Sequence, residues 1–372
     1  MAFPKIVFLF ISSRILFILF ALLASYIIPL DSGYIGKQFL PDTQYPSWIW
    51  ANFDGRHFLN IATKGYQNFD FAFFPLYPFL ISIFSFLNPL YVGILISSAS
   101  FLTALYFLVK LVKFDYSSNV AFWTIFFACF FPLSFFNHSV YSDSLFFLLG
   151  VLSFYYARKA SWVWAGFFAA LASMTRLSGI VLVPALVVEW YLQNKTNVVK
   201  TQPRVPAIKA FPGIFLGSLG MGGYMLALDI FKGDPFLFQK SFSAWNQSEV
   251  VLPFQVVFRY IKIFLSVNPK LLVYWIAILE FVSLTLYLFL SLYVFKKVRV
   301  SYGLFTVALL LLVPFTGTFA GTPRYLLHLF PGFIALALLL QNKPVWRNAL
   351  IVLFISLGFV LTALFTRGYF VT

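Results

Sequence analysis

Long apolar runs separated by short polar segments dominate this chain. Runs such as 6–30 and 271–295 are long enough to cross a hydrocarbon core, which takes about 20 residues. The pattern predicts about 11 transmembrane helices, at 6–30, 89–112, 119–137, 142–157, 162–176, 178–192, 210–231, 271–295, 301–320, 325–341 and 348–366. These runs recur from one end to the other, so we expect an all-α polytopic membrane protein in which residues 1–372 form a single transmembrane domain.

Composition supports the same class. Hydrophobic residues make up 61% of the chain and charged residues 10%, with a mean hydropathy of +0.90, whereas soluble proteins carry about 25% charged residues. The net charge of +15 would suggest nucleic acid in a soluble protein. Here the tendency of Lys and Arg to gather in cytoplasmic loops explains it, and we expect no nucleic-acid partner. With Cys129 as its one cysteine, the chain has no internal disulfide and no cysteine metal cluster.

The basic residues predict the topology. With the N-terminus in the cytoplasm, most of them fall in short inner loops: Lys5, Lys110, Lys113, Arg158, Lys159, Lys195, Lys200, Arg204, Lys209, Lys296, Lys297, Arg299, Lys343 and Arg347. The apolar segment 73–87 has only 15 residues and includes Pro75 and Pro78. Since a crossing there would invert every later loop, we expect this segment to lie in or dip into the outer leaflet. Two long outer loops follow, 31–88 and 232–270.

The first outer loop holds the most informative stretch, residues 48–66. Asp54 precedes apolar positions at a helical spacing, which predicts a short interfacial helix with an acid at its positive dipole end. Asp54 is then either a helix cap, a role that Asn52 could also fill, or a catalytic acid. Arg56 and His57 beside it favour a site, although His57 alone is more typical of an interfacial hydrogen-bonding side chain.

Two further polar positions border apolar sequence on the outer side. Tyr77 lies between two prolines in 72–78, where it could reach a polar partner. Residues 137–144 form a polar island that contains His138 and Asp143. Ionisable residues at membrane depth are costly and are functional candidates. Asp143 is therefore either a second site acid or the cap of the helix that follows it.

Two outward arginines suit a phosphate. Arg176 interrupts an apolar stretch, and Arg324 follows Pro323 at the start of another. A guanidinium binds phosphate as an always-charged, bidentate fork. The alternative is that each side chain snorkels to the headgroups only to stay solvated.

The chain contains no Walker A, dinucleotide-binding or HExxH motif. No cofactor is expected, and a divalent metal is possible but not indicated. Glu280 lies inside a predicted span and is interpreted either as a structural residue or as part of an ion path.

Three blocks resemble the PIG-V-like glycosyltransferases, relatives of GPI mannosyltransferase II. They are FDGRHFLNIATKGY with AFFPLYPFLI, then the stretch from VYSDSLFFLLG through MTRLSG to VVEW, and finally GTPRYLLHLFPGF. The chain departs from the family pattern where the family has Trp before the first acid, Tyr four residues after it, Thr-Glu-Ser in the second block and Pro after Thr-Arg. The positions here are Phe53, Phe58, Ser142 with Asp143, and Leu177.

The resemblance implies a GT-C helical bundle with interfacial helices in the first outer loop. It also implies a polyprenyl- or dolichyl-phosphate sugar donor, usually carrying mannose, that is used on the outer face. In residue terms it makes Asp54 the catalytic acid, puts Asp143 in the second acidic motif and puts Arg176 and Arg324 in the arginine motifs.

Together these observations predict an inverting membrane hexosyltransferase, with Asp54 as general base and Asp143 orienting the acceptor or the sugar. Arg324 and Arg176 would bind the donor phosphate, and Arg56, His57, Tyr77 and His138 would line the substrate site. The acceptor is an unknown glycan, lipid or protein. The site is expected outside the cytoplasm, in the cell membrane of a prokaryote or the endoplasmic reticulum of a eukaryote. The alternative is a transporter or lipid flippase with Asp143 and Glu280 as coupling residues, although the chain shows no internal repeat.

Overall fold

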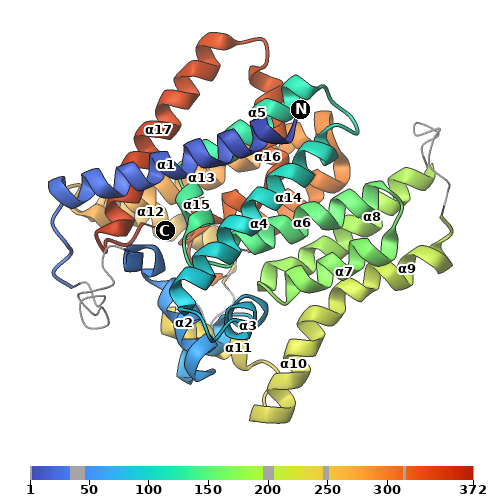
Figure 1. The fold of residues 1–372 in the computed structure, drawn as a ribbon, viewed down its shortest axis with the longest axis horizontal. Coiled ribbons are helices and arrows are strands. Elements are labelled where there is room, and N and C mark those ends of the chain that lie inside the picture. Colours follow the sequence, from blue (N-terminus) through green and yellow to red (C-terminus); the bar gives the residue numbers. More distant parts are fainter. Residues whose placement is uncertain (1, 34–46, 196–204, 246–250, 313–315, 372) are drawn as a thin grey trace. The chain divides into compact units, whose positions relative to one another are not determined.

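The computed structural model describes residues 2–33, 47–195, 205–245, 251–312 and 316–371. All regular elements in these ranges are helices, arranged as in Figure 1. The parts of the two predicted outer loops at 34–46 and 246–250, with Asp42 and Glu249, lie outside the described residues, as do Lys200 and Arg204.

Every predicted span overlaps at least one helix, but the spans 119–137 and 301–320 extend beyond the helices Ser118–Phe130 and Val300–Leu312. In the described part of the chain, six segments are long and apolar enough to cross a membrane: Phe3–Ile27, Pro89–Val112, Leu177–Lys195, Ala207–Lys232, Leu272–Val298 and Pro344–Thr366. The bent pair Thr322–His328 and Phe330–Leu340, with an angle of 81°, makes a seventh if it is one span. The fold class is therefore confirmed as an all-helical multi-pass membrane protein, and the count of eleven crossings stays a prediction.

The segment at 73–87 forms a helix of only eight residues, α3 (Leu76–Ile83). At about 1.5 Å per residue this helix is roughly 12 Å long, well short of a hydrocarbon core of about 30 Å. Its length agrees with the expectation that it does not cross the membrane.

The chain divides into two compact units, and the single-domain organisation stays a prediction. The first unit comprises residues 1–66, 76–148 and 336–371. Its helices are α1 (Phe3–Ile27), η3 (Ser47–Ala51), α2 (Asp54–Lys64), α3, α4 (Pro89–Val112), α5 (Ser118–Phe130), η5 (Ser134–His138), the start of α6 (Asp143–Arg158), the end of α16 (Phe330–Leu340) and α17 (Pro344–Thr366).

In the first unit, α1 packs against α4, α5 and α17. Local sequence explains where its neighbours begin. Asn88 caps α4 by accepting a hydrogen bond from the amide of Leu90 at 3.0 Å, and Pro89 occupies the first helical position. Large apolar side chains such as Phe8 and Leu23 remain exposed on α1, as expected for a surface that faces lipid.

The second unit comprises residues 67–75 and 149–335. It contains η4 (Asn68–Ala72), the rest of α6, α7 (Trp162–Ser173), η6 (Leu177–Val181), α8 (Leu182–Lys195), α9 (Ala207–Phe215), η7 (Leu216–Ser218), α10 (Leu219–Lys232), α11 (Leu237–Ser241), η8 (Phe242–Trp245), α12 (Pro253–Ser266), α13 (Leu272–Tyr293), η9 (Val294–Val298), α14 (Val300–Leu312), α15 (Thr322–Tyr325), η11 (Leu326–His328) and most of α16.

Glycines let α7 and α9 approach each other closely. A Cβ on Gly166 would lie 1.6 Å from the carbonyl oxygen of Gly213, so no larger residue fits without moving a backbone. Small residues at such contacts are typical of helix pairs in membranes, where the driving force is close packing.

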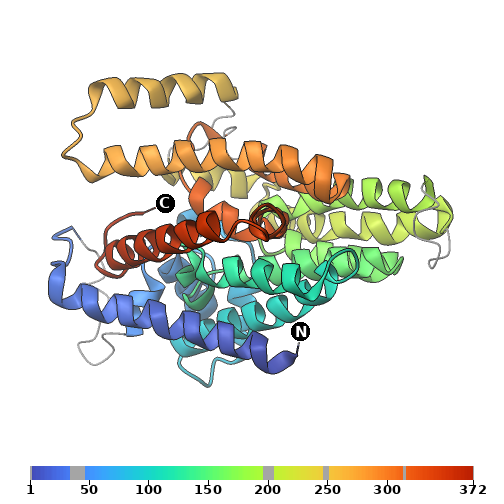
Figure 2. The ribbon, with the colours of Figure 1, turned by 90° about the horizontal axis from the view of Figure 1, so that it is seen from above.

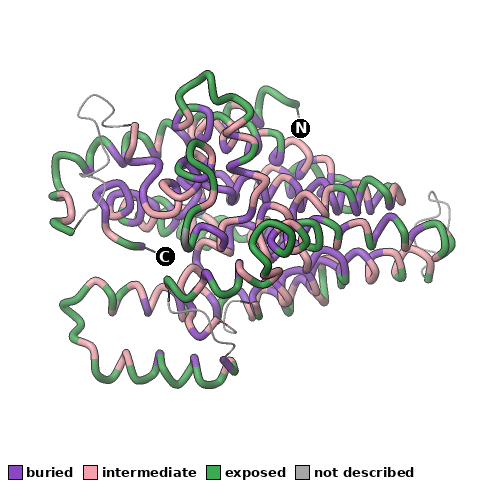
Figure 3. Tube along the Cα trace, turned by 90° about the horizontal axis from the view of Figure 1, so that it is seen from below, coloured by how far each residue is buried: buried purple, intermediate pink, exposed green. Residues whose placement is uncertain are grey.

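Helices α12 and α13 of the same unit lie side by side and antiparallel in Figure 2. Figure 3 shows that much of their surface is exposed. On α12 the exposed apolar side chains include Phe254, Phe258 and Leu265. The surface of this pair is therefore the kind that lipid or a membrane interface covers.

Candidate active site

The first unit contains both predicted acids. Asp54 is the first residue of α2, in the turn with the positive end of the helix dipole, and its side chain is half-buried. The cap position belongs to Phe53, which makes no side-chain cap bond. The amide of Asn52 donates to the carbonyl oxygen of Phe365 at 2.8 Å. The catalytic and capping interpretations of Asp54 both stay predictions.

The backbone directly before Asp54 is strained. Phe53 has a φ of +55°, a left-handed conformation that non-glycine residues rarely adopt. Its ring contacts those of Phe365 and Phe370, with centroids 5.8 and 5.9 Å away. Such strain costs on the order of 1–3 kcal/mol and clusters at functional sites, where surrounding contacts maintain it.

The acid-bearing segments are tied together by hydrogen bonds. The amide of Val140 donates to the carbonyl oxygen of Trp50 at 2.8 Å, and the hydroxyl of Tyr141 donates to that of Asn52 at 2.7 Å. Asp143 follows after Ser142 as the first residue of α6 and is fully buried. Residues 50–54 and 140–143 therefore form one connected structure around the two acids.

Other predicted site residues of this unit surround that structure. Arg56 and His57 lie half-buried on the first turn of α2. Tyr77 is fully buried, and its hydroxyl contacts the carbonyl oxygen of Gly93 at 3.0 Å and the hydroxyl of Ser97 at 2.8 Å. Burial raises the pKa of Tyr77, so the hydroxyl stays protonated. These contacts suit a side chain that joins α3 to α4, and a contact of Tyr77 with substrate stays a prediction.

His138 lies between Trp50 and α4. Its ring meets the Trp50 ring edge to face at 5.2 Å, and its Nδ1 lies 3.2 Å from the hydroxyl of Ser98. Burial, assisted by the positive charge of Arg14, lowers the pKa of His138 to about 4. The imidazole is therefore neutral near pH 7, so it can donate one hydrogen bond and accept another without carrying charge.

The two predicted phosphate-binding arginines lie in the second unit on segments that contact each other. Arg176 directly precedes η6, and Arg324 lies in the short helix α15 after Gly321, whose φ is +81°. The guanidinium of Arg176 lies 5.1 Å from the ring centroid of Tyr325, the residue next to Arg324. A cation over an aromatic ring is attracted to the ring face. Within this unit the two arginine motifs therefore meet.

Glu280 is 4% exposed inside α13 and accepts a hydrogen bond from the hydroxyl of Tyr260 on α12. That hydroxyl in turn accepts from the amide of Phe319 at 3.1 Å. No basic residue in the described ranges forms an ion pair with Glu280. The contacts link Glu280 to the segment before α15.

No sequence motif pointed to Arg14. It lies near the middle of the apolar helix α1, is 6% exposed and bonds to the buried Ser134. The signal that could have found it is simple, since a lone charge inside a span is a functional candidate by default. No group of three or more His, Cys, Asp or Glu in the described residues has a geometry that could hold a metal ion.

Comparison with solved structures places the fold. The chain resembles ArnT from Cupriavidus metallidurans bound to undecaprenyl phosphate, with 14% identity, a TM-score of 0.52 and coverage of 91% of this chain and 62% of ArnT. It also resembles the Archaeoglobus fulgidus oligosaccharyltransferase tethered with an acceptor peptide, with 12% identity, a TM-score of 0.42 and coverage of 96% and 55%. The chain thus spans about six tenths of the length of ArnT. No curated protein matched the chain.

The fold is therefore that of the GT-C membrane glycosyltransferases. The family model of the mannosyltransferase PIG-V matches residues 5–277, and the chain belongs to this family. The resemblance identified from the sequence blocks is confirmed, and family membership supports the glycosyltransferase over the transporter alternative.

Proposed function

We propose that this protein moves a hexose, with mannose as the first candidate, from a polyprenyl- or dolichyl-phosphate donor to an acceptor hydroxyl on the extracytoplasmic face, with inversion at the sugar. The observation that carries the proposal is the position of Asp54. It begins a short amphipathic helix, directly after a strained residue, on a segment hydrogen-bonded to the one that leads to Asp143.

Asp54 acts as the general base. Its carboxylate accepts the proton of the acceptor hydroxyl while the hydroxyl oxygen forms a bond to C1 of the sugar. The bond between C1 and the phosphate oxygen breaks on the opposite face, and its electron pair leaves with the lipid phosphate. Asp143 orients the acceptor or the sugar, and Arg56, His57 and His138 contribute hydrogen bonds around them.

Arg176 and Arg324 stabilise the charge that grows on the leaving phosphate. Their support is the contact within the second unit between the Arg176 guanidinium and Tyr325, which brings the two motifs together. Guanidinium groups keep their charge and match phosphate oxygens in pairs. Loss of either arginine should therefore weaken both donor binding and the chemical step.

A lipid-linked donor is supported by two observations. The described helices are apolar enough to sit in a bilayer, where a long isoprenoid chain also resides. ArnT, which shares the fold, is described as bound to undecaprenyl phosphate. The acceptor remains a hydroxyl on a glycan, lipid or protein.

The test uses purified protein in lipid vesicles, radiolabelled polyprenyl-phosphate mannose and a membrane lipid extract as acceptor. We expect wild type to transfer the label and Asp54→Asn to lose about 10²–10⁴-fold in rate, the usual contribution of a general base. Donor binding should survive in Asp54→Asn, since the base acts on the acceptor.

Asp31→Asn is the matched control, because Asp31 belongs to the same predicted outer loop and, among the described residues, its side chain accepts a local bond from the amide of Gly33 at 2.8 Å. Full activity of Asp54→Asn would remove Asp54 from the mechanism and direct attention to Asp143. Absence of transfer by wild type across several lipid-phosphate hexoses would contradict the donor class.

A further inference from the structure

Arg14 is a buried cation in the apolar helix α1 without a carboxylate partner among the described residues. Its guanidinium lies 5.2–5.8 Å from the ring centroids of Phe10, Phe17 and Phe101. A charge in such surroundings is costly unless its donors are satisfied. The groups that accept hydrogen bonds from the guanidinium therefore indicate the role of Arg14.

The donors of Arg14 converge on the connection between α5 and α6. Nη1 donates to the carbonyl oxygen of Ser134 at 2.7 Å, and Nη2 donates to the hydroxyl of the same residue at 2.8 Å. A longer contact of 3.5 Å reaches the carbonyl oxygen of Cys129, near the negative end of the α5 dipole. Arg14 thus holds one end of the largely buried segment between α5 and α6.

From Ser134 a chain of buried side chains continues to α6. The amide of Asn137 donates to the hydroxyl of Ser134 at 3.3 Å, and its oxygen accepts from the hydroxyl of Ser144 at 3.1 Å. Ser134, Asn137 and Ser144 are at most 2% exposed. Since Ser144 is the residue after Asp143, the chain that starts at Arg14 ends beside the second acid.

The same segment also contacts residues 50–54, which lead to Asp54. The contacts are the hydrogen bonds of Val140 to Trp50 and of Tyr141 to Asn52. The field of Arg14 extends there too, since Arg14 contributes to the lowered pKa of His138. A side chain that fixes residues 134–144 therefore influences the geometry around both acids.

We infer that Arg14 is a positioning residue that, through Ser134, Asn137 and Ser144, sets the place of Asp143 in the active site. This inference rests on the proposed function in one respect, the participation of Asp143 in transfer. Arg14 touches no substrate in this assignment, and it acts through the segment it holds.

The test is a double-mutant cycle on transfer of mannose from polyprenyl-phosphate mannose in lipid vesicles, at enzyme concentrations that register residual activity. Arg14→Met and Asn137→Ala should each lower kcat/KM at least about 10-fold in the wild-type background. In the Asp143→Asn background each should change it less than about 2-fold, because the residue they position is no longer functional. Arg14→Lys, which keeps the charge, should recover part of the activity.

Two controls match these variants. Arg347→Met removes an arginine of the same unit that rests on Trp123 at 4.2 Å and lies outside the network. Asn88→Ala removes an asparagine whose side chain caps α4 and costs about 1 kcal/mol of stability. Both controls should leave kcat/KM per folded molecule unchanged. Equal losses from Arg14→Met in the wild-type and Asp143→Asn backgrounds would overturn the inference, because a purely structural effect does not depend on Asp143.

A second measurement separates this inference from the proposed function. Amide hydrogen exchange of peptides covering 134–144 should accelerate at least about 10-fold in Arg14→Met and Asn137→Ala and stay unchanged in Arg347→Met. Unchanged exchange in Arg14→Met and Asn137→Ala would overturn the positioning role even if transfer is intact. Absence of transfer by wild type, or full activity of Asp143→Asn, would instead contradict the proposed function, and exchange would still report on the network.

Discussion

Two buried polar networks, one in each unit, satisfy charge in opposite ways. In the first unit the cation Arg14 is bonded by carbonyl and hydroxyl groups, chiefly those of Ser134. In the second unit the anion Glu189 on α8 is fully buried and is bonded by Arg299 through two hydrogen bonds of 2.6 and 2.7 Å. The first network is neutral apart from its arginine, and the second is an ion-paired cluster.

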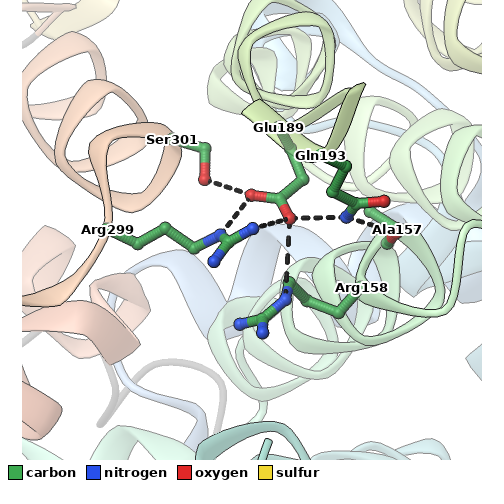
Figure 4. Close-up of polar contacts among 6 residues, drawn as sticks. All are labelled: Ala157, Arg158, Glu189, Gln193, Arg299 and Ser301. Carbon is green, nitrogen blue, oxygen red and sulfur yellow. Dashed lines mark hydrogen bonds and ion pairs between the residues drawn. The ribbon is translucent and has the colours of Figure 1, made fainter. Parts of the chain in front are cut away.

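Figure 4 shows the polar contacts that converge on the carboxylate of Glu189. Ser301 donates to the carboxylate at 2.6 Å and Gln193 at 2.7 Å, while Nε of Arg158 lies 3.6 Å away. The amide of Gln193 also reaches the carbonyl oxygen of Ala157 at 2.9 Å. These residues join the ends of α6, α8 and α14, where the topology predicts the cytoplasmic side.

The comparison teaches that burial of a charge does not by itself indicate function. The Glu189 cluster contains none of the predicted site residues, so we expect it to contribute stability alone. The Arg14 network leads to Ser144 beside Asp143, so we expect it to affect transfer. Substitutions in the two networks should separate stability from activity.

The largest effect is expected from Glu189→Ala. It would leave the half-buried Arg299 and the buried Arg158 without their carboxylate, and breaking a buried pair in this way costs about 3–5 kcal/mol. The free energy of unfolding in mixed micelles measures it, together with kcat per folded molecule, which should not change. A loss below about 1 kcal/mol, or a fall in kcat with stability intact, would break the proposed division between the networks.

A pH effect of up to about 3 kcal/mol is expected in the first unit from His138, whose pKa shifts from 6.5 to about 4 on folding. Between these pH values the unfolded chain binds more protons than the folded one, so the free energy of unfolding rises with pH. The contribution of His138 reaches its full value above about pH 6.5. Denaturation measured from pH 4 to 7 should show this slope. His138→Gln should flatten this slope. Arg14→Met should narrow the pH range over which stability changes, because the charge of Arg14 helps to lower the pKa of His138. An unchanged slope in His138→Gln would exclude His138 as its source.

Arg299→Lys should cost less, about 1–2 kcal/mol. Lysine keeps the charge but cannot donate both of the hydrogen bonds that the guanidinium fork directs at the carboxylate. Lys296→Arg, three residues earlier at an exposed position of η9, serves as a control for exchanging one cation for the other. A cost as large as that of Glu189→Ala would mean that geometry, rather than charge, dominates the cluster.

The smallest effect is expected from Ser301→Ala, about 1 kcal/mol. Its hydroxyl bonds the same carboxylate oxygen that Nε of Arg299 already reaches at 2.6 Å, so the oxygen keeps one donor. Thermal unfolding should detect a modest decrease in Tm with normal transfer. A decrease as large as that of Glu189→Ala would show that the serine, and not the ion pair, holds these helices.

Much of the fold could be predicted because its signals are local. Each signal lies within a few consecutive residues, as in the apolar runs, the prolines of 73–87 and the polar segment at the start of α2. The same holds for the motifs of Asp54, Asp143, Arg176 and Arg324. The strained backbone of Phe53 had no such signal, because the aromatic contacts that maintain it come from Phe365 and Phe370 at the other end of the chain.

By itself the sequence predicted a multi-pass helical membrane protein that resembles the PIG-V-like glycosyltransferases, and it indicated which acids and arginines are candidates for its chemistry. Hydropathy and short motifs depend on neighbours in the chain, so they can be read without coordinates. Only the tertiary structure decided the partners of the buried charges. Arg14 meets Ser134 across 120 positions and Glu189 meets Arg299 across 110, and such pairings follow from how helices pack.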